Sequence, residues 1–205
     1  MPEEPKPKFK GRYSRFLEKI DEILARMAPQ HDDESKAHTA FTSGEMAELR
    51  RMHPELDEPR PPLFWKLLCH YGVIGTSEQD TFLSPAAERR WAAVIQGMAM
   101  TAELCRGAKD DFGFALGSAE ESGDSLSKRF DQLMRATPER FIVLLRQMLK
   151  LALSKDCAFS WASLAPLILA ADESVRLRQK MRLTQSFYIA QEKKQFAETS
   201  GGDAK

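Results

Sequence analysis

Acidic, histidine and cysteine side chains are the groups in this sequence that could hold a metal ion or carry out catalysis, and their spacing favours neither. Asp32–Asp33–Glu34 and Asp110–Asp111 are acidic clusters of the kind that bind divalent cations, but both lie in polar loop sequence, where solvated acids are the commoner interpretation. The four histidines stand at positions 31, 38, 53 and 70, without cysteines at metal-ligand spacing and without a nucleophile beside them. No glycine-rich phosphate loop, nucleophile elbow or His-Glu-x-x-His motif occurs. We therefore expect no catalytic residue, no metal and no cofactor.

The positive charge of the chain, in contrast, is gathered in two stretches. The whole chain is neutral, with 30 basic and 30 acidic residues, yet residues 126–150 carry six basic residues against two acids, and residues 174–194 carry six against Glu192 alone. The first stretch holds Lys128, Arg129, Arg135, Arg140, Arg146 and Lys150, and the second holds Arg176, Arg178, Lys180, Arg182, Lys193 and Lys194. Arginine suits bidentate contact with phosphate. The residues therefore indicate binding to an anionic surface, with a merely solvated face as the alternative.

Helices must position these residues, because hydrophobic residues recur at three- and four-residue spacing along most of the chain. Residues 9–28 form one such pattern. Ser84–Pro85 and Thr137–Pro138 are helix starts, each with an N-cap hydroxyl and a proline in the first turn, and Ser160 and Asp172 can cap two more helices. No run alternates apolar and polar residues for long enough to predict a strand. We predict an all-α protein, a two-part helical bundle of about eight to nine helices without a significant sheet.

The predicted helices turn much of the positive charge away from the core. Seven basic residues lie on sides that face away from the apolar stripes: Lys128, Arg129, Arg135, Arg146, Lys150, Arg178 and Arg182. In the last helix, Leu177, Met181 and Tyr188 form the predicted apolar side. Most aromatic residues fall on apolar stripes, so we predict no platform for base stacking. A nucleic acid would be held by its phosphates, with salt-sensitive affinity that is nearly blind to sequence.

Changes in composition divide the chain into four parts. These are an N-terminal extension of helix and linker (residues 1–42), an N-terminal helical domain (43–111), a C-terminal helical bundle (112–194) and a disordered tail (195–205). No secretion signal and no window of about 18 apolar residues occurs, so we expect a cytoplasmic protein without a membrane span. Cys69, Cys105 and Cys157 are far apart and odd in number, which predicts reduced, buried thiols.

The order of several motifs resembles a known family. The stretch "DFGFALGSAEES…LSKRFDQLMRATPERFIVLLRQMLKLAL" is followed by "FSWASLAPLILAAD" and "VRLRQKMRLTQSFYI", and "GEMAELRR" and "PPLFWKLL" stand upstream. Together, over about residues 44 to 190, they resemble the small subunit of the type I-E CRISPR surveillance complex, Cascade (the CasB family). One departure is Gly113-Phe114-Ala115-Leu116, where that family often has an arginine at the second position.

The resemblance implies an all-helical subunit without catalytic activity of its own. Two copies would sit in an RNA-guided complex against the crRNA-coating backbone subunits and the large subunit, and a basic surface would stabilise the R-loop by holding single-stranded DNA. The family's paired arginines fall on Arg50 and Arg51, and its other basic motifs fall on Lys128–Arg129, Arg135 and Arg146. DNA-backbone contacts by protein suit this task, because the guide–target heteroduplex is about as stable as the duplex that it replaces.

Two alternatives to this function remain open at the level of the sequence. The stretch "SLAPLILAADESVRLRQKMRLTQ" could form a helix-turn-helix of a sequence-specific regulator, although its turn lacks glycine. The chain could also be a structural helical adaptor whose basic face binds an acidic protein. Specific duplex binding would favour the regulator, and indifference to DNA within the full assembly would favour the adaptor.

Overall fold

The described part of the chain is built from α-helices alone. The computed structural model describes residues 14–28, 41–75, 82–119 and 124–201, and within these ranges it contains ten helices and no strand. The helices are α1 (Ser14–Glu18), α2 (Ile20–Met27), α4 (Ser43–Arg51), α5 (Pro62–His70), α6 (Pro85–Cys105), α7 (Phe112–Gly117), α8 (Asp124–Arg135), α9 (Pro138–Ser154), α10 (Trp161–Leu169) and α11 (Glu173–Gly201). The predicted all-α class is confirmed. The helix predicted over residues 9–28 is divided at Lys19 into α1 and α2.

Local capping explains where several helices begin. Thr42 and Glu45 form a capping box at α4, in which the Glu45 backbone N–H donates to Thr42 Oγ1 (3.2 Å) and the Thr42 N–H donates to Glu45 Oε2 (2.9 Å). Ser84 caps α6 as predicted, and Asp172 accepts a 2.9 Å bond from the N–H of Val175 in α11. The helices α9 and α10 begin at the predicted residues but without a side-chain cap bond.

The long helix α6 forms the centre of the molecule. It packs against α2, α4, α9 and α10, and most of its residues from Trp91 to Cys105 are buried. Gly97 allows this packing, because a Cβ atom there would lie 2.8 Å from Leu149 Cδ1 and 2.8 Å from Trp161 Cζ2, and closer still to Cη2 of the same ring. The Trp161 Nε1–H donates to Thr101 Oγ1 (2.9 Å), so the indole is both packed and hydrogen-bonded.

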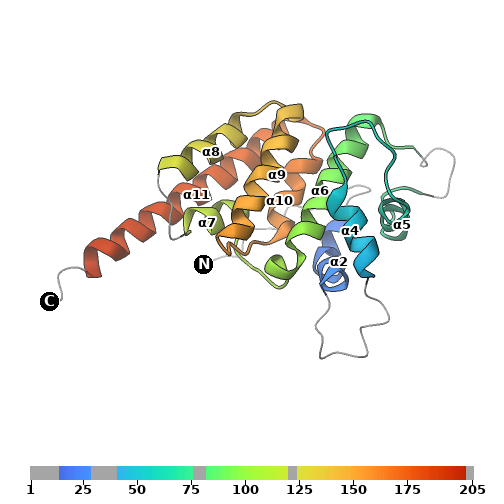
Figure 1. Cartoon of the computed structure of the whole chain (residues 1–205). Helices are drawn as coiled ribbons and strands as arrows, with labels where there is room; N and C mark the ends of the chain where they lie inside the picture. The colour runs from blue at the N-terminus through green and yellow to red at the C-terminus, as the bar shows by residue number, and fades with distance from the viewer. Residues whose placement is uncertain (1–13, 29–40, 76–81, 120–123, 202–205) are drawn as a thin grey trace.

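The last helix, α11, packs most closely against the short helix α7. Gly113 and Gly117 of α7 face the backbone of α11, and side chains at these two positions would overlap the carbonyl groups of Leu183 and Phe187. Figure 1 shows α11 beside α8 and extending past the other helices at its C-terminal end. The helix runs to Gly201, beyond residue 194, where the sequence predicted a tail to begin.

The structure corrects the predicted apolar side of α11. Its buried side chains are Leu183, Phe187 and Ala190, and the Phe187 ring stacks on Phe130 of α8 at a centroid distance of 4.2 Å. The residues that the sequence placed on the packing side are exposed: Leu177 by 54%, Met181 by 63% and Tyr188 by 41%. Hydrophobic residues occur around most of this helix, so spacing alone did not identify the buried side.

One hydrophobic core runs through both predicted helical parts. The buried cluster includes side chains from α2, α4, α5 and α6 together with side chains from α8, α9, α10 and α11. The boundary predicted at residues 111 and 112 falls at the start of α7, and it stays a prediction. The predicted N-terminal extension is described only for residues 14–28 and 41–42, since its other residues lie outside the described ranges.

Candidate nucleic-acid interface

The basic residues of α8 lie on its outer side. Its buried side chains, Leu126, Phe130, Leu133 and Met134, recur at three- and four-residue spacing and pack against the bundle. The side chains of Lys128, Arg129 and Arg135 are exposed on the remainder of the helix. The amphipathic pattern of α8 was therefore sufficient to place these three cations.

Contacts between α8 and α11 bring the two basic stretches together. The Tyr188 hydroxyl donates to Asp131 Oδ1 (3.0 Å), Gln191 Nε2–H donates to Ser127 Oγ (2.9 Å), and Lys180 Nζ donates to the Ala136 carbonyl (3.1 Å). The residue numbers rise along one helix as they fall along the other, so the helices are antiparallel. This register places Arg135 and Arg182 at the same end of the pair.

Four arginines on this helix pair are exposed without an ion pair among the described residues. They are Arg129, Arg135, Arg178 and Arg182. Their guanidinium groups therefore need no exchange of partners before they contact an anion. We refer to these four residues as the α8–α11 basic face.

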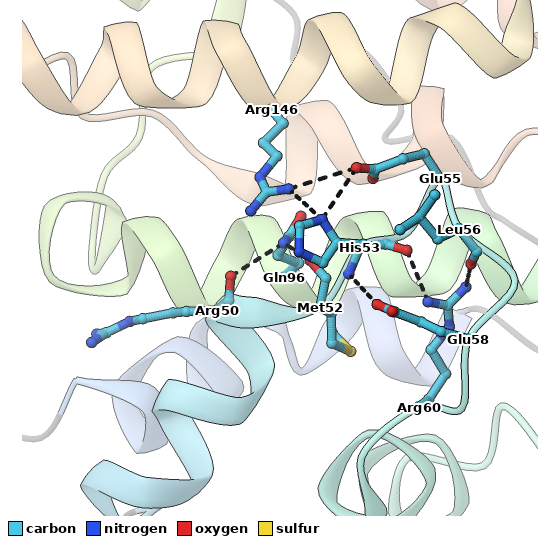
Figure 2. A network of polar contacts seen from close by, with 9 residues as sticks. All are labelled: Arg50, Met52, His53, Glu55, Leu56, Glu58, Arg60, Gln96 and Arg146. Atoms are coloured by element: carbon cyan, nitrogen blue, oxygen red, sulfur yellow. Dashed lines mark hydrogen bonds and ion pairs between the residues drawn. The ribbon is translucent and has the colours of Figure 1, made fainter.

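Arg146 of α9, by contrast, is engaged within the fold. Its side chain is 25% exposed, and Nη1 lies 3.1 Å from His53 Nδ1 and 3.7 Å from Glu55 Oε1 (Figure 2). Its Nε is buried and has no hydrogen-bond partner. Sequence reasoning could not detect this contact, because His53 and Glu55 are about 90 residues away along the chain. Lys150, one turn further along α9, is exposed.

Near Arg146, the side chains of Arg60 and Gln96 hold the end of α4 and the segment between α4 and α5 in place. Arg60 is almost fully buried, donates to the carbonyls of His53 (3.0 Å) and Leu56 (3.0 Å), and pairs with Glu88 of α6 (3.0 Å). The amide of Gln96 donates to the carbonyls of Arg50 (3.2 Å) and Met52 at the end of α4 (Figure 2). These side chains satisfy carbonyl groups that have no partner inside a helix.

Arg50 and Arg51, at the C-terminal end of α4, have different surroundings. Arg50 Nε–H donates to the Ala99 carbonyl of α6 (2.9 Å), and the residue lines a pocket of about 380 Å³ together with Glu103 and Asp156. The two carboxylates make this pocket less favourable for a phosphate. Arg51 is exposed. The predicted site residues thus lie in two groups, one on α8 and α11 and the other on α4 and α9.

Lys180 is one of the basic residues of the last helix but is not among the predicted site residues. In the structure it lies half-buried at the turn between α8 and α9, and burial lowers its pKa from the usual value for lysine. Lys180 is two residues from both Arg178 and Arg182, and this spacing alone indicates that it lies on a different side of the helix from these two arginines.

The structure also bears on metal binding, membrane insertion and thiol reactivity. Among the described residues, no three histidine, cysteine or acidic side chains are arranged to hold a metal ion, and no helix there is long and apolar enough to cross a membrane. Burial raises the pKa of the Cys105 thiol and of the Cys157 thiol, which disfavours the reactive thiolate. Cys69 is exposed, contrary to its predicted burial.

The described residues form an all-α protein whose antiparallel helices α8 and α11 each carry exposed arginines. The chain belongs to the family described as CRISPR-associated protein Cse2, whose model matches residues 45–188, well over half of the sequence. This match confirms the resemblance to the small subunit of type I-E Cascade, and it makes the chain a structural subunit of that complex. No curated protein and no solved structure matches the chain.

Proposed function

We propose that this chain is a non-catalytic subunit that stabilises the R-loop by holding DNA backbone, of the displaced or target strand, on the α8–α11 basic face. The observation that carries the proposal is that Arg129, Arg135, Arg178 and Arg182 are exposed and have no ion pair among the described residues. Arginines in this state can form bidentate contacts with phosphates without losing an interaction inside the protein.

The energetics of strand exchange explain why a few such contacts suffice. The RNA–DNA heteroduplex is about as stable as the DNA duplex that it replaces, so contacts to the DNA backbone shift the balance toward the open state. Such contacts release counterions from the DNA and do not read its sequence, which suits a subunit that must act on any target. The proposed partners are neighbouring Cascade subunits and a second copy of this chain, which together with the α8–α11 basic face form the complete DNA-binding surface.

The other predicted residues contribute to this proposal unequally. Lys128 is exposed on α8, and Lys150 and Arg51 are exposed in the second group, so each can add a phosphate contact of its own. Arg146 can reach a phosphate only by exchanging its contacts with His53 and Glu55. Arg50 faces two carboxylates across its pocket, so it is the weakest of the predicted contacts.

The helix-turn-helix alternative is less favoured by the surroundings of α10. This helix would be the first of the motif, yet all of its residues except Ala162 are buried in the core. We expect the protein to show no preference for a particular duplex sequence. Tight binding to one duplex would support the regulator instead.

A matched pair of double variants in the reconstituted complex tests the proposal. Arg135→Gln/Arg182→Gln removes two charges from the α8–α11 basic face, whereas Lys66→Gln/Lys109→Gln removes two exposed charges from α5 and from the segment after α6. The lifetime of the R-loop is measured over a salt series. We expect the arginine variant to shorten the lifetime and to reduce the salt slope by about 1.4 per subunit copy, since each single-strand phosphate contact contributes about 0.7. Equal lifetimes for the two variants would refute the proposal.

A further inference from the structure

A second candidate binding site lies where α6, α9, α10 and α11 meet. It is an open pocket of about 80 Å³, and its wall is formed by apolar groups that include Ala86, Phe141, Ile142, Leu167 and Ile168. None of these residues belongs to the α8–α11 basic face. Because its wall is apolar, the pocket fits a ligand with apolar groups better than it fits a phosphate backbone.

The size of the pocket limits what can fill it. A buried cavity of about 150 Å³ lined by aliphatic and aromatic side chains binds benzene. This pocket has roughly half that volume, so it accommodates the branched end of an aliphatic side chain but not a nucleobase. The apolar wall would also gain nothing from a phosphate group.

The rim of the pocket is positively charged. Arg89, Arg90, Arg176 and Lys180 line it, and Glu139 is the acid among the lining residues. Lys180 has uncharged neighbours at this rim: its Nζ donates a hydrogen bond to the neutral Ala136 carbonyl (3.1 Å) and lies over the Phe141 ring, 5.9 Å from the ring centroid. Among the described residues, no carboxylate lies within ion-pair distance of its Nζ.

Two of the other rim cations hold exposed partners. Arg89 pairs with Asp57 (2.6 Å) and Arg176 pairs with Glu173 (2.8 Å), and the acidic side chains are 76% and 77% exposed. The Arg89–Asp57 pair lies at the surface, where an ion pair contributes about 0–1 kcal/mol, so a carboxylate from a partner can replace Asp57 at low cost.

We propose that this pocket binds one aliphatic side chain, such as leucine or isoleucine, flanked by acidic residues on a segment of a neighbouring protein chain. The aliphatic group fills the apolar wall, and a flanking carboxylate pairs with Lys180. The site is independent of the proposed DNA contacts, and it gives the subunit a means of docking onto an acidic protein surface.

Methyl NMR of the full-length protein tests this docking site. Ile142 and Ile168 line the pocket, so their labelled δ1-methyl signals report its occupation. The probes are two capped peptides, Glu-Asp-Leu-Glu-Asp and Glu-Asp-Ala-Glu-Asp, and an oligothymidine. We expect the leucine peptide to shift both signals and to bind about fiftyfold more tightly than the alanine peptide, because leucine has three more side-chain carbons and each buried methylene adds about 0.8 kcal/mol.

Three variants make the test specific. Ala86→Leu fills the pocket, Lys180→Met removes the proposed cation, and Ala162→Leu adds the same volume at an exposed position in the first turn of α10, outside the pocket. The first two variants should lose most of the affinity for the leucine peptide, and the third should retain it. Binding that survives Ala86→Leu, an absence of shifts at millimolar leucine peptide, or shifts produced by oligothymidine instead would each overturn the proposal. None of these outcomes depends on the R-loop experiment.

Discussion

The close contact between α7 and α11 should be sensitive to a single methyl group. In a Gly113→Ala variant, the new Cβ would lie 3.0 Å from the carbonyl carbon of Leu183 and 3.2 Å from the backbone nitrogen of Phe187, and closer still to the Leu183 oxygen. Backbone atoms of a packed helix cannot rotate aside as the end of a flexible side chain can. The variant must therefore push α11 away from α7, and α11 carries Arg178 and Arg182.

The magnitude follows from two opposing terms. Alanine has a higher helix propensity than glycine by up to about 1 kcal/mol in a helix interior. Overpacking a well-packed core costs about 1–3 kcal/mol, and a backbone obstacle places this site at the upper end of that range. We expect the free energy of unfolding to fall by about 2 kcal/mol. Because m is about 2 kcal/mol per molar in urea, the midpoint should fall by about 1 M.

Urea denaturation followed by circular dichroism measures this change, and Gly44→Ala is the matched control. Gly44 also lies in a helix, but a Cβ built there would have no atom within 4 Å apart from those of its chain neighbours and its own helix backbone. The control should be neutral or stabilised by up to about 1 kcal/mol. If Gly113→Ala were as stable as the control variant, the close approach of α7 and α11 described above would be wrong.

Three other features should respond to perturbation. Thr42→Ala removes the capping box of α4 and should lower the free energy of unfolding by about 1 kcal/mol in thermal denaturation, whereas Thr42→Ser should retain most of it. Arg60→Met leaves Glu88 and the carbonyls of His53 and Leu56 without the donor that Arg60 supplies, and it should cost about 2–3 kcal/mol in denaturant; a loss below about 0.5 kcal/mol would contradict the network. Cys69 should react with a maleimide in the native protein, and Cys105 only after unfolding. Burial raises the pKa of the Cys105 thiol, so the contribution of this thiol to stability is complete at pH values below the ordinary thiol pKa of 9.0. The contribution should be lost as the pH rises through the raised pKa of the folded state. A protein that loses stability only when the pH is lowered would contradict this.

Local signals in the sequence determined most helix positions and the fold class. Ser84–Pro85 and Asp172 mark the starts of α6 and α11 because capping depends on residues within one turn. The outer position of the α8 cations was predictable for a similar reason, since one regular apolar stripe fixes both the buried and the exposed side of a helix.

Tertiary structure decided which predicted cations are open. Arg146 and Arg135 look alike in sequence, but Arg146 meets His53 and Glu55 of a distant segment, and Arg135 meets no acid among the described residues. The buried side of α11 was likewise set by contact with Gly113 and its neighbours in α7, because hydrophobic residues occur around most of α11. Periodicity assigns a side only where one stripe dominates. Elsewhere the choice depends on long-range contacts, which spacing along the chain does not contain.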